Sequence, residues 1–400
     1  MTGNKSYYYT KFIFFIRYLA DALFYCYPAL YLASVGISEG LIGTILSLTT
    51  ITGLILNPIW SIVVKNNKVH RILLFVLSII EGALIITYGN VTSVEGLMAL
   101  TCLMAVVASP YYNLLDGYAA GLCNKYVKEY SRIRVMGSTA YLVALVASGF
   151  LLDYLGFKTL FLISGIIFII TGVLTIFLEK YEIDLEVETK KEEKKRNYKS
   201  IIKNKWFIGF CIAYTCTAYL TMTSDSFISL VFTKIKGVTS GQYSWIHGGA
   251  ILIEVITIYA LGKLRRNVNL NKIFLIAGIL LFLRPFIISF TELPTIVLMF
   301  GTWIRGIGWG MMLFVALKII MNLVGLENTT TACLIVAIFQ SLFQFIMSNV
   351  IGYTIEFIGY RWAFLIISGI ILFTTITYTL ILIKTKRFHL SLNDEIHIKN

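Results

Sequence analysis

PYYNLLDGYAAGLCNKYVKEYSRIRVMGSTAY, residues 110–141, joins two apolar segments through a polar turn around Lys125. Asp116 lies nine residues before Lys125, and Arg134 lies nine residues after it. If both segments are helices, a rise of about 1.5 Å per residue places the acid and the base at the same depth, about 13 Å from the turn. A charge inside a bilayer is costly unless it is paired or faces a polar cavity. The pair is therefore predicted to form part of a functional site. The alternative is a structural ion pair that orients two helices.

The composition indicates an integral membrane protein. Of the 400 residues, 58% are hydrophobic and 14% are charged, and the mean hydropathy is +0.80, so no single soluble core would hide the apolar side chains. Apolar segments long enough to cross about 30 Å of hydrocarbon recur along the chain. The sequence predicts an all-α membrane protein with twelve transmembrane helices in two six-helix, pseudo-symmetric bundles. These helices are expected at residues 11–34, 41–64, 72–89, 97–121, 132–154, 157–178, 205–233, 243–262, 273–290, 294–322, 331–355 and 361–384.

The basic residues predict the topology. Of the 34 Lys and Arg residues, 27 fall on one side of the predicted membrane, which by the positive-inside rule is the cytoplasm. Both termini are therefore expected in the cytoplasm of a multi-pass cell (inner) membrane protein. The first six residues are short and polar, and the apolar run after them is too long for a signal core, so we expect the first helix to be retained. The net charge of +13 is spread over loops and predicts no nucleic-acid binding.

Several chemistries have no matching pattern. The six cysteines show no CxxC spacing and no histidine at ligand distance, so neither disulfides, a metal site nor a cofactor is predicted. The four histidines are scattered, without an HExxH or Gly-x-Ser-x-Gly motif, which argues against a membrane enzyme. A phosphate-binding Gly-Lys-Ser/Thr loop is also missing, which argues against an ATP-driven pump.

The two halves of the chain repeat one another. The turn GISEG at Gly36 corresponds to GVTSG at Gly237, and DYLGFKTLFLI from Asp153 corresponds to EFIGYRWAFLI from Glu356. The segment between the halves mixes charges of both signs, which is typical of a solvated linker. We predict an N-terminal bundle (1–178), a cytoplasmic linker (179–204), a C-terminal bundle (205–384) and a cytoplasmic tail (385–400).

This order of features resembles the branch of the major facilitator superfamily that contains lactose permease, nucleoside:proton symporters and the phenylpropionate permease. The resemblance covers nearly the whole chain. It implies two six-helix repeats with a solute bound near the midplane between them. The implied partners are a small-molecule solute, protons and the lipid bilayer, and we expect a monomer. The residues that carry the resemblance are Pro28, Asn57-Pro58, Asp116, RIRVMG from Arg132, Arg284, Lys318 and EFIGYRWAFL from Glu356.

Resemblance to lactose permease implies that Asp116 and Arg134 bind the solute and that Tyr141 stacks on it, although Tyr141 is equally well explained as a packing aromatic. Arg284 matches an arginine of the proton-coupling machinery. The tenth helix departs from the permease pattern, with Arg305 in place of a histidine and Gly308 in place of the proton-carrying glutamate. The coupling residue is therefore not assigned by the resemblance.

The remaining buried charges suggest further roles. Arg17 and Asp21 are four residues apart and share one helix face, where they would either line the binding cavity or form an internal ion pair. Glu81, Asp225 and Glu254 are acids in apolar segments that could each hold a proton. Arg284 and Arg305 are their expected partners in the second half. Glu254 is the preferred proton carrier and Asp225 the second choice.

These observations predict a secondary active transporter that takes up a small polar organic solute, such as a sugar, a nucleoside or an aromatic acid, together with a proton by alternating access. The segment ALVASGFLLDYLG, residues 144–156, lacks the glycine-rich signature of drug antiporters, which favours uptake. A uniporter or a proton-driven exporter of the same fold is the alternative. A membrane-embedded enzyme is a remote one.

Overall fold

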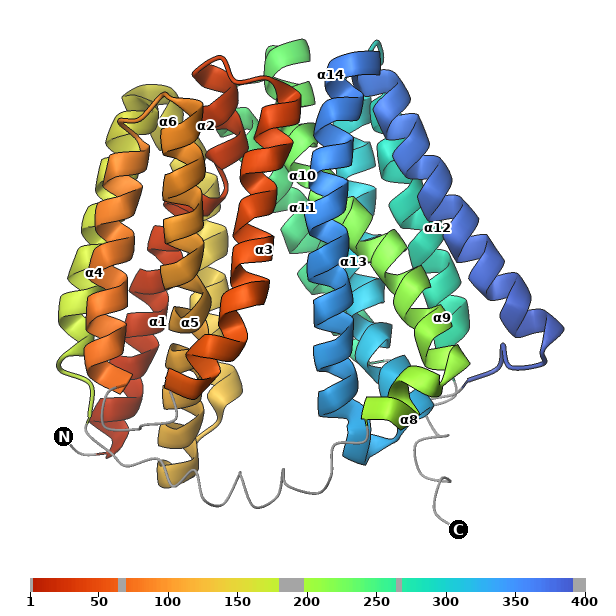
Figure 1. Cartoon of the computed structure of the whole chain (residues 1–400), viewed down its shortest axis with the longest axis horizontal. Helices are drawn as coiled ribbons and strands as arrows, with labels where there is room; N and C mark the ends of the chain where they lie inside the picture. The colour runs from red at the N-terminus through yellow and green to blue at the C-terminus, as the bar shows by residue number, and fades with distance from the viewer. Residues whose placement is uncertain (1–2, 64–69, 180–197, 264–267, 391–400) are drawn as a thin grey trace. The chain divides into compact units, whose positions relative to one another are not determined.

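The computed structural model describes residues 3–63, 70–179, 198–263 and 268–390, which are mostly helical (Figure 1). Most of the predicted linker and part of the predicted tail lie outside the described residues. The helices of the first half are α1 (Gly3–Tyr25), α2 (Pro28–Ser34), α3 (Glu39–Val63), α4 (His70–Tyr88), α5 (Val94–Tyr126) and α6 (Tyr130–Thr175). Those of the second half are α8 (Tyr198–Lys203), α9 (Lys205–Tyr214), η2 (Thr215–Tyr219), α10 (Leu220–Leu230), η3 (Val231–Ile235), α11 (Ser240–Gly262), α12 (Leu270–Ser289), α13 (Thr295–Val324), η4 (Leu326–Asn328) and α14 (Thr329–Lys384).

Two helices are about twice the length that a membrane span requires. Helix α6 has 46 residues and α14 has 56, and each contains one glycine with a non-helical backbone, Gly156 (φ 74°) and Gly359 (φ 84°). Ten stretches of the described residues are long and apolar enough to cross a membrane. Because α6 and α14 each divide at their glycine into two spans, this result agrees with the twelve predicted helices.

The sequence repeat is also a repeat of backbone conformation. Gly36 (φ 85°) and Gly237 (φ 64°) occupy matching turns, just as Gly156 and Gly359 do. Positive φ costs little for glycine and much more for residues with a Cβ atom. The chain therefore keeps glycine where each half must turn from one helix into the next.

Local sequence explains where several helices begin. Asn204 and Asn269 cap α9 and α12, each accepting hydrogen bonds from two backbone N–H groups of the first turn. The first predicted helix differs from the observed structure, because α1 ends at Tyr25 and a new helix, α2, starts at Pro28. Proline lacks the N–H that a continuous helix needs at this position, but it is well suited to a first helical turn.

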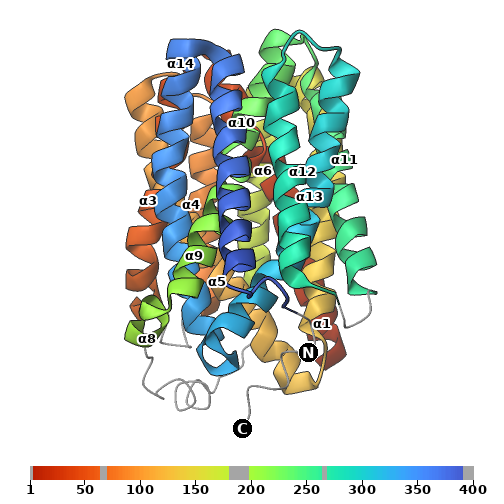
Figure 2. The same ribbon diagram turned by 90° about the vertical axis from the view of Figure 1, so that its right-hand side faces the viewer.

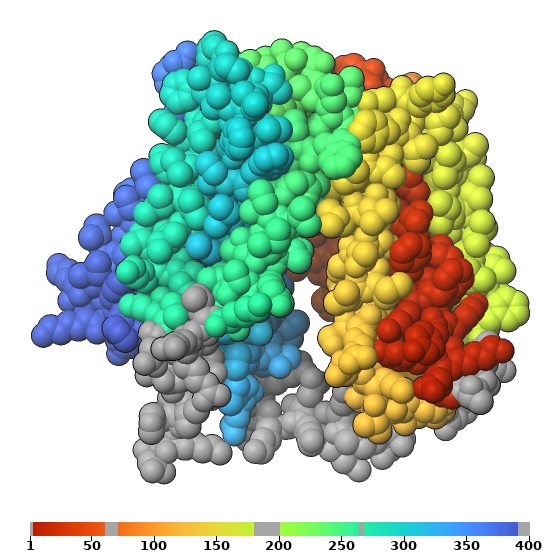
Figure 3. Space-filling view, turned by 180° about the vertical axis from the view of Figure 1, so that it is seen from behind, coloured from red at the N-terminus to blue at the C-terminus, as the bar shows by residue number. Residues whose placement is uncertain are grey.

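The helices gather into two compact units. Unit 1 comprises Met1–Glu188 and Val238–Trp245, and unit 2 comprises Thr189–Gly237 and Ile246–Asn400. In unit 1, α1 packs along α6, and α4 packs against α5 and α6. Figure 3 shows α1 in red beside the yellow first part of α6. In unit 2, α12 packs between α13 and α14 (Figure 2).

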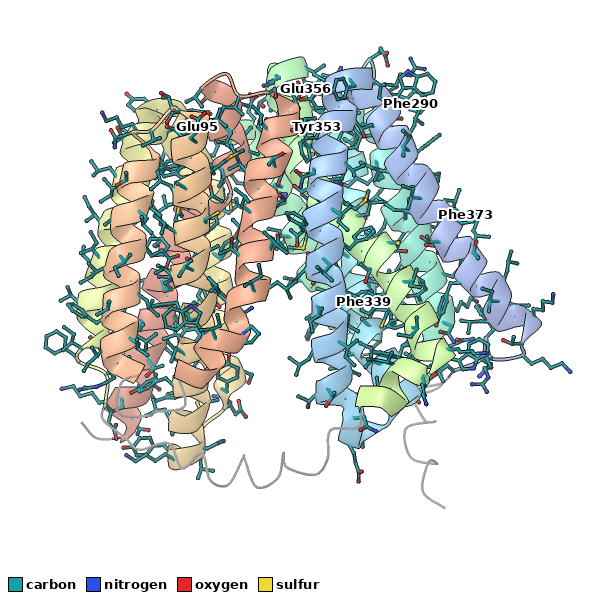
Figure 4. The ribbon with its side chains drawn as sticks, viewed as in Figure 1. Glu95, Phe290, Phe339, Tyr353, Glu356 and Phe373 are labelled. Atoms are coloured by element: carbon teal, nitrogen blue, oxygen red, sulfur yellow. The ribbon has the colours of Figure 1, made fainter. Side chains whose placement is uncertain are left out.

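The surface of each unit is unusually apolar. Phe339 and Phe373 of α14 are exposed, Phe373 to 70%, and lie along the helix away from its ends (Figure 4). Glu95, in contrast, lies in the first turn of α5 (Figure 4). Large apolar side chains along the middle of helices and charges at their ends are the distribution that a lipid bilayer favours.

Candidate functional site

Asp116 in α5 and Arg134 in α6 form an ion pair in unit 1. Nη1 of Arg134 lies 3.1 Å from Oδ1 and 3.2 Å from Oδ2 of Asp116, and it also donates to the hydroxyl of Tyr18 in α1. A short turn through Val127 (φ 51°) separates α5 from α6. This helical hairpin brings the acid and the base together at matching depth.

The exposure of this pair indicates what it can do. The side chains of Arg134 and Asp116 are 45% and 37% exposed, so both can reach a ligand while they remain paired. Asn113 on α5 is exposed as well, and Ser109 donates a hydrogen bond to the exposed Asn57 of α3. A carboxylate, a guanidinium and amides within apolar helices can bind the hydroxyl, amide or carboxylate groups of a polar solute.

A second cluster of charges is sealed inside unit 1. Nη2 of Arg17 donates to Oε2 of Glu81 at 2.6 Å, and Nε of Arg17 lies 3.4 Å from Oδ1 of Asp21. Arg17 and Glu81 are 0% exposed and Asp21 is 3% exposed. The role in solute binding predicted for Arg17 and Asp21 stays a prediction.

Aromatic rings enclose the guanidinium of this cluster. Its central carbon lies 3.8 Å from the ring centroid of Tyr111 and 4.2 Å from that of Phe168. Stacking of this kind stabilises a buried cation through the negative face of each ring. The sequence did not predict the Arg17–Glu81 pair, because the two residues are 64 positions apart and nothing in the sequence showed that α1 and α4 bring them into contact.

A third cluster lies in unit 2. Asp225 of α10 accepts from Arg284 of α12 and, at 2.9 Å, from Nη2 of Arg305 of α13. Nη1 of Arg305 also lies 3.7 Å from Oε2 of Glu254 in α11. Four helices therefore contribute two arginines and two acids, and the structure brings together the four residues that the sequence proposed for proton coupling. That coupling role stays a prediction.

Tyr141 is in a different environment from the Asp116–Arg134 pair. Its hydroxyl lies 3.0 Å from Sγ of Cys26, in the break between α1 and α2. The aromatic ring over the guanidinium of Arg134 is that of Tyr18, whose centroid is 5.1 Å from the central carbon of that group. Tyr18 was missed by sequence reasoning, although its position next to the buried Arg17 was a usable signal.

Comparisons with known sequences agree with this architecture. The chain matches the model of the Major Facilitator Superfamily over residues 12–233. It is 21% identical to the maltose permease of Geobacillus stearothermophilus over 230 residues, which cover 58% of this chain and 57% of that protein. It therefore spans just over half the length of that relative. It is also 22% identical over 353 residues to an uncharacterized transporter, YwbF, of Bacillus subtilis (strain 168), covering 88% of this chain and 86% of that protein.

Solved structures share the fold. The chain superposes on a variant of the nucleoside transporter NupG with a TM-score of 0.80 at 14% identity, covering 94% of this chain and 99% of that one. It also resembles a bacterial homolog of the human lysosomal transporter Spinster, with a TM-score of 0.70, 12% identity and 98% of both chains covered. Because the family model matches more than half of the sequence, the chain belongs to the Major Facilitator Superfamily and is a multi-pass membrane transporter, not an enzyme.

Proposed function

We propose that this transporter is a proton-coupled symporter that takes up a small polar organic solute, such as a sugar, a nucleoside or an aromatic acid, by alternating access. The observation that carries the proposal is that the side chains of Asp116 and Arg134 stay partly exposed although they are paired, because a partly exposed ion pair within apolar helices is most stable where it also faces water or a polar ligand. A maltose permease and a nucleoside transporter among the similar proteins support a polar solute.

In the proposed site, Asp116 and Arg134 hydrogen-bond neighbouring polar groups of the solute, and Arg134 is the group best placed to bind a carboxylate. Tyr141 covers the apolar side of the solute, and Arg17 with Asp21 support the site from α1 without touching the solute, because both are buried. Asn113, one helical turn before Asp116 on α5, adds an amide donor and acceptor near the pair.

In the proposed coupling site, Glu254 carries the proton. Asp225 is held by two arginines, Arg284 and Arg305, and is therefore stabilised as a carboxylate. Glu254 lies 3.7 Å from Arg305, a looser contact, so it exchanges a proton more readily than Asp225. We further propose that both chain termini are cytoplasmic, that the halves 1–178 and 205–384 are the moving bodies, and that the protein acts as a monomer.

Uptake into proteoliposomes tests the proposal. Purified protein is reconstituted, and accumulation of radiolabelled sugars, nucleosides and aromatic acids is followed with and without an imposed inward proton gradient. We expect one class to accumulate above its external concentration when the gradient is present, and Glu254→Gln to abolish accumulation while solute exchange persists. Uptake that ignores the gradient would identify a uniporter, and outward accumulation would identify an exporter.

A further inference from the structure

The sealed cluster of unit 1 contains one more acid than base. If Asp21 and Glu81 were both ionised beside Arg17, a net negative charge would be locked in a packed interior where the three residues are at most 3% exposed. An uncompensated charge in such an environment is strongly unfavourable. The cluster of unit 2 differs, because its two arginines balance its two carboxylates. The unit 1 cluster therefore needs one bound proton to be neutral.

The contacts indicate which acid holds that proton. Both oxygens of Glu81 accept strong hydrogen bonds, Oε2 from Arg17 at 2.6 Å and Oε1 from the hydroxyl of Tyr25 at 2.5 Å. Oδ1 of Asp21 is buried and receives no hydrogen bond from the described residues, although Nε of Arg17 is 3.4 Å away, and the carboxyl group has one side-chain hydrogen bond, with Tyr112. Two strong donors stabilise a carboxylate, whereas an oxygen without a donor is tolerated best in a neutral acid. We propose that Asp21 binds a proton and that Arg17, Asp21 and Glu81 form a proton-binding site within unit 1.

The groups around Asp21 support a neutral acid. Two of them are cations, but Arg17 makes its closer contact with Glu81, at 2.6 Å against 3.4 Å to Asp21, and Arg134 is paired with Asp116. The others, apart from Glu81 itself, are phenols or a thiol, which are uncharged at neutral pH. The titratable and charged groups that interact with Asp21 are Arg17, Tyr18, Tyr25, Cys26, Glu81, Tyr111, Tyr112, Arg134 and Tyr141.

Two phenols connect this proton site with the exposed pair. The hydroxyl of Tyr112 accepts from Nη2 of Arg17 at 3.5 Å, and its ring lies 6.0 Å from the ring of Tyr18, centroid to centroid. Tyr18 in turn accepts from Arg134. A solute that engages Arg134 would change the electrostatic field at Asp21, so that solute and proton binding are linked within unit 1. This linkage, unlike the proton site itself, rests on the proposed function.

Two substitutions test the proton site without any transport assay. Asparagine imitates a protonated aspartate, so Asp21→Asn should leave the thermal midpoint of the detergent-solubilised protein unchanged. Glu81→Gln removes the ionised partner of Arg17 and should lower the midpoint by about 5 °C or more. If Asp21→Asn lowers the midpoint as much as Glu81→Gln does, or prevents folding, Asp21 is an ionised partner of Arg17 and the proposal fails.

Infrared spectroscopy supplies an independent readout. The wild-type protein at neutral pH should show the carbonyl stretch of a protonated carboxyl group, and a component of this band should be missing in Asp21→Asn and present in Glu254→Gln. Identical carboxyl bands in wild type and Asp21→Asn would refute the proton site. Neither measurement requires solute movement, so a negative uptake experiment would remove the proposed function and leave this inference standing.

Discussion

At the residue scale, the Asp116–Arg134 pair can be removed without disturbing the core, because both side chains are partly exposed. Asp116→Asn and Arg134→Ala should each weaken solute binding about tenfold to a hundredfold, the loss expected for charge-assisted hydrogen bonds of about 1.5–3 kcal/mol. The measurement is the solute-dependent shift of the thermal midpoint in detergent. Arg132→Ala is the matched control. Arg132 is only two residues from Arg134 in the sequence, but it pairs with the exposed Glu129. Normal binding by both variants would show that the pair is structural.

A second residue-scale prediction concerns Glu179, which lies beyond the last turn of α6. Its carboxylate accepts from Lys125 at 2.7 Å, from Tyr126 at 2.6 Å and from Ser6. Burial would raise the pKa of Glu179, but these hydrogen bonds prevail and lower it from 4.5 to about 2. Glu179 therefore ties the start of α1 to the end of α5.

Because its pKa is lower in the folded than in the unfolded protein, the stabilisation by Glu179 is fully present above about pH 4.5. It is lost as the pH falls toward about 2. We expect Glu179→Gln to reduce the free energy of unfolding by about 1–2 kcal/mol at pH 7 and to flatten its decline below pH 4.5. Chemical denaturation from pH 7 down to pH 3 measures both effects. A variant whose stability falls with pH as steeply as that of the wild type would contradict the assignment.

At the element scale, the crossing of α11 and α13 depends on Gly306. A Cβ atom at this position would overlap the carbonyl oxygen of Ala250 in α11, and backbone cannot move aside as a flexible side chain can. Gly306→Ala should therefore push α11 away and cost about 1–3 kcal/mol, as overpacking generally does. The displacement would also lengthen the contact between Arg305 and Glu254.

The thermal midpoint of Gly306→Ala in detergent checks this prediction. Gly369→Ala in α14 is the control, since nothing lies within 4 Å of the Cβ atom it would add, and alanine is the better helix former. The control should be neutral or slightly stabilising. Equal midpoints for the two variants would show that α11 and α13 are not held at contact distance.

At the scale of the whole molecule, the charge distribution predicts a topology that labelling can test. A cysteine is introduced at Lys158 or at Lys203 after the six native cysteines are replaced. Both positions are exposed and belong to opposite sides of the predicted membrane. We expect a membrane-impermeant maleimide added to intact cells to label the cysteine at position 158 and to label the one at position 203 after lysis. The reverse pattern would place both termini outside.

The sequence by itself determined the fold class, because apolar segments of membrane length leave helices as the one structure that satisfies every backbone hydrogen bond in lipid. The glycines of the repeat also identified the matching turns. A backbone with positive φ favours glycine at that one position, so the residue type alone marks the turn. The Asp116–Arg134 pair was predictable because its residues flank one short turn, and geometry along a hairpin follows from helical rise.

Tertiary structure alone decided the partners of the other charges. Arg17 pairs with Glu81 from α4, Asp225 is shared by α12 and α13, and the ring over the guanidinium of Arg134 is that of Tyr18. These contacts depend on how each helix is rotated about its axis and which neighbour it meets. That rotation is set by packing between helices distant in sequence, and apolar segments with little amphipathic pattern do not encode it locally.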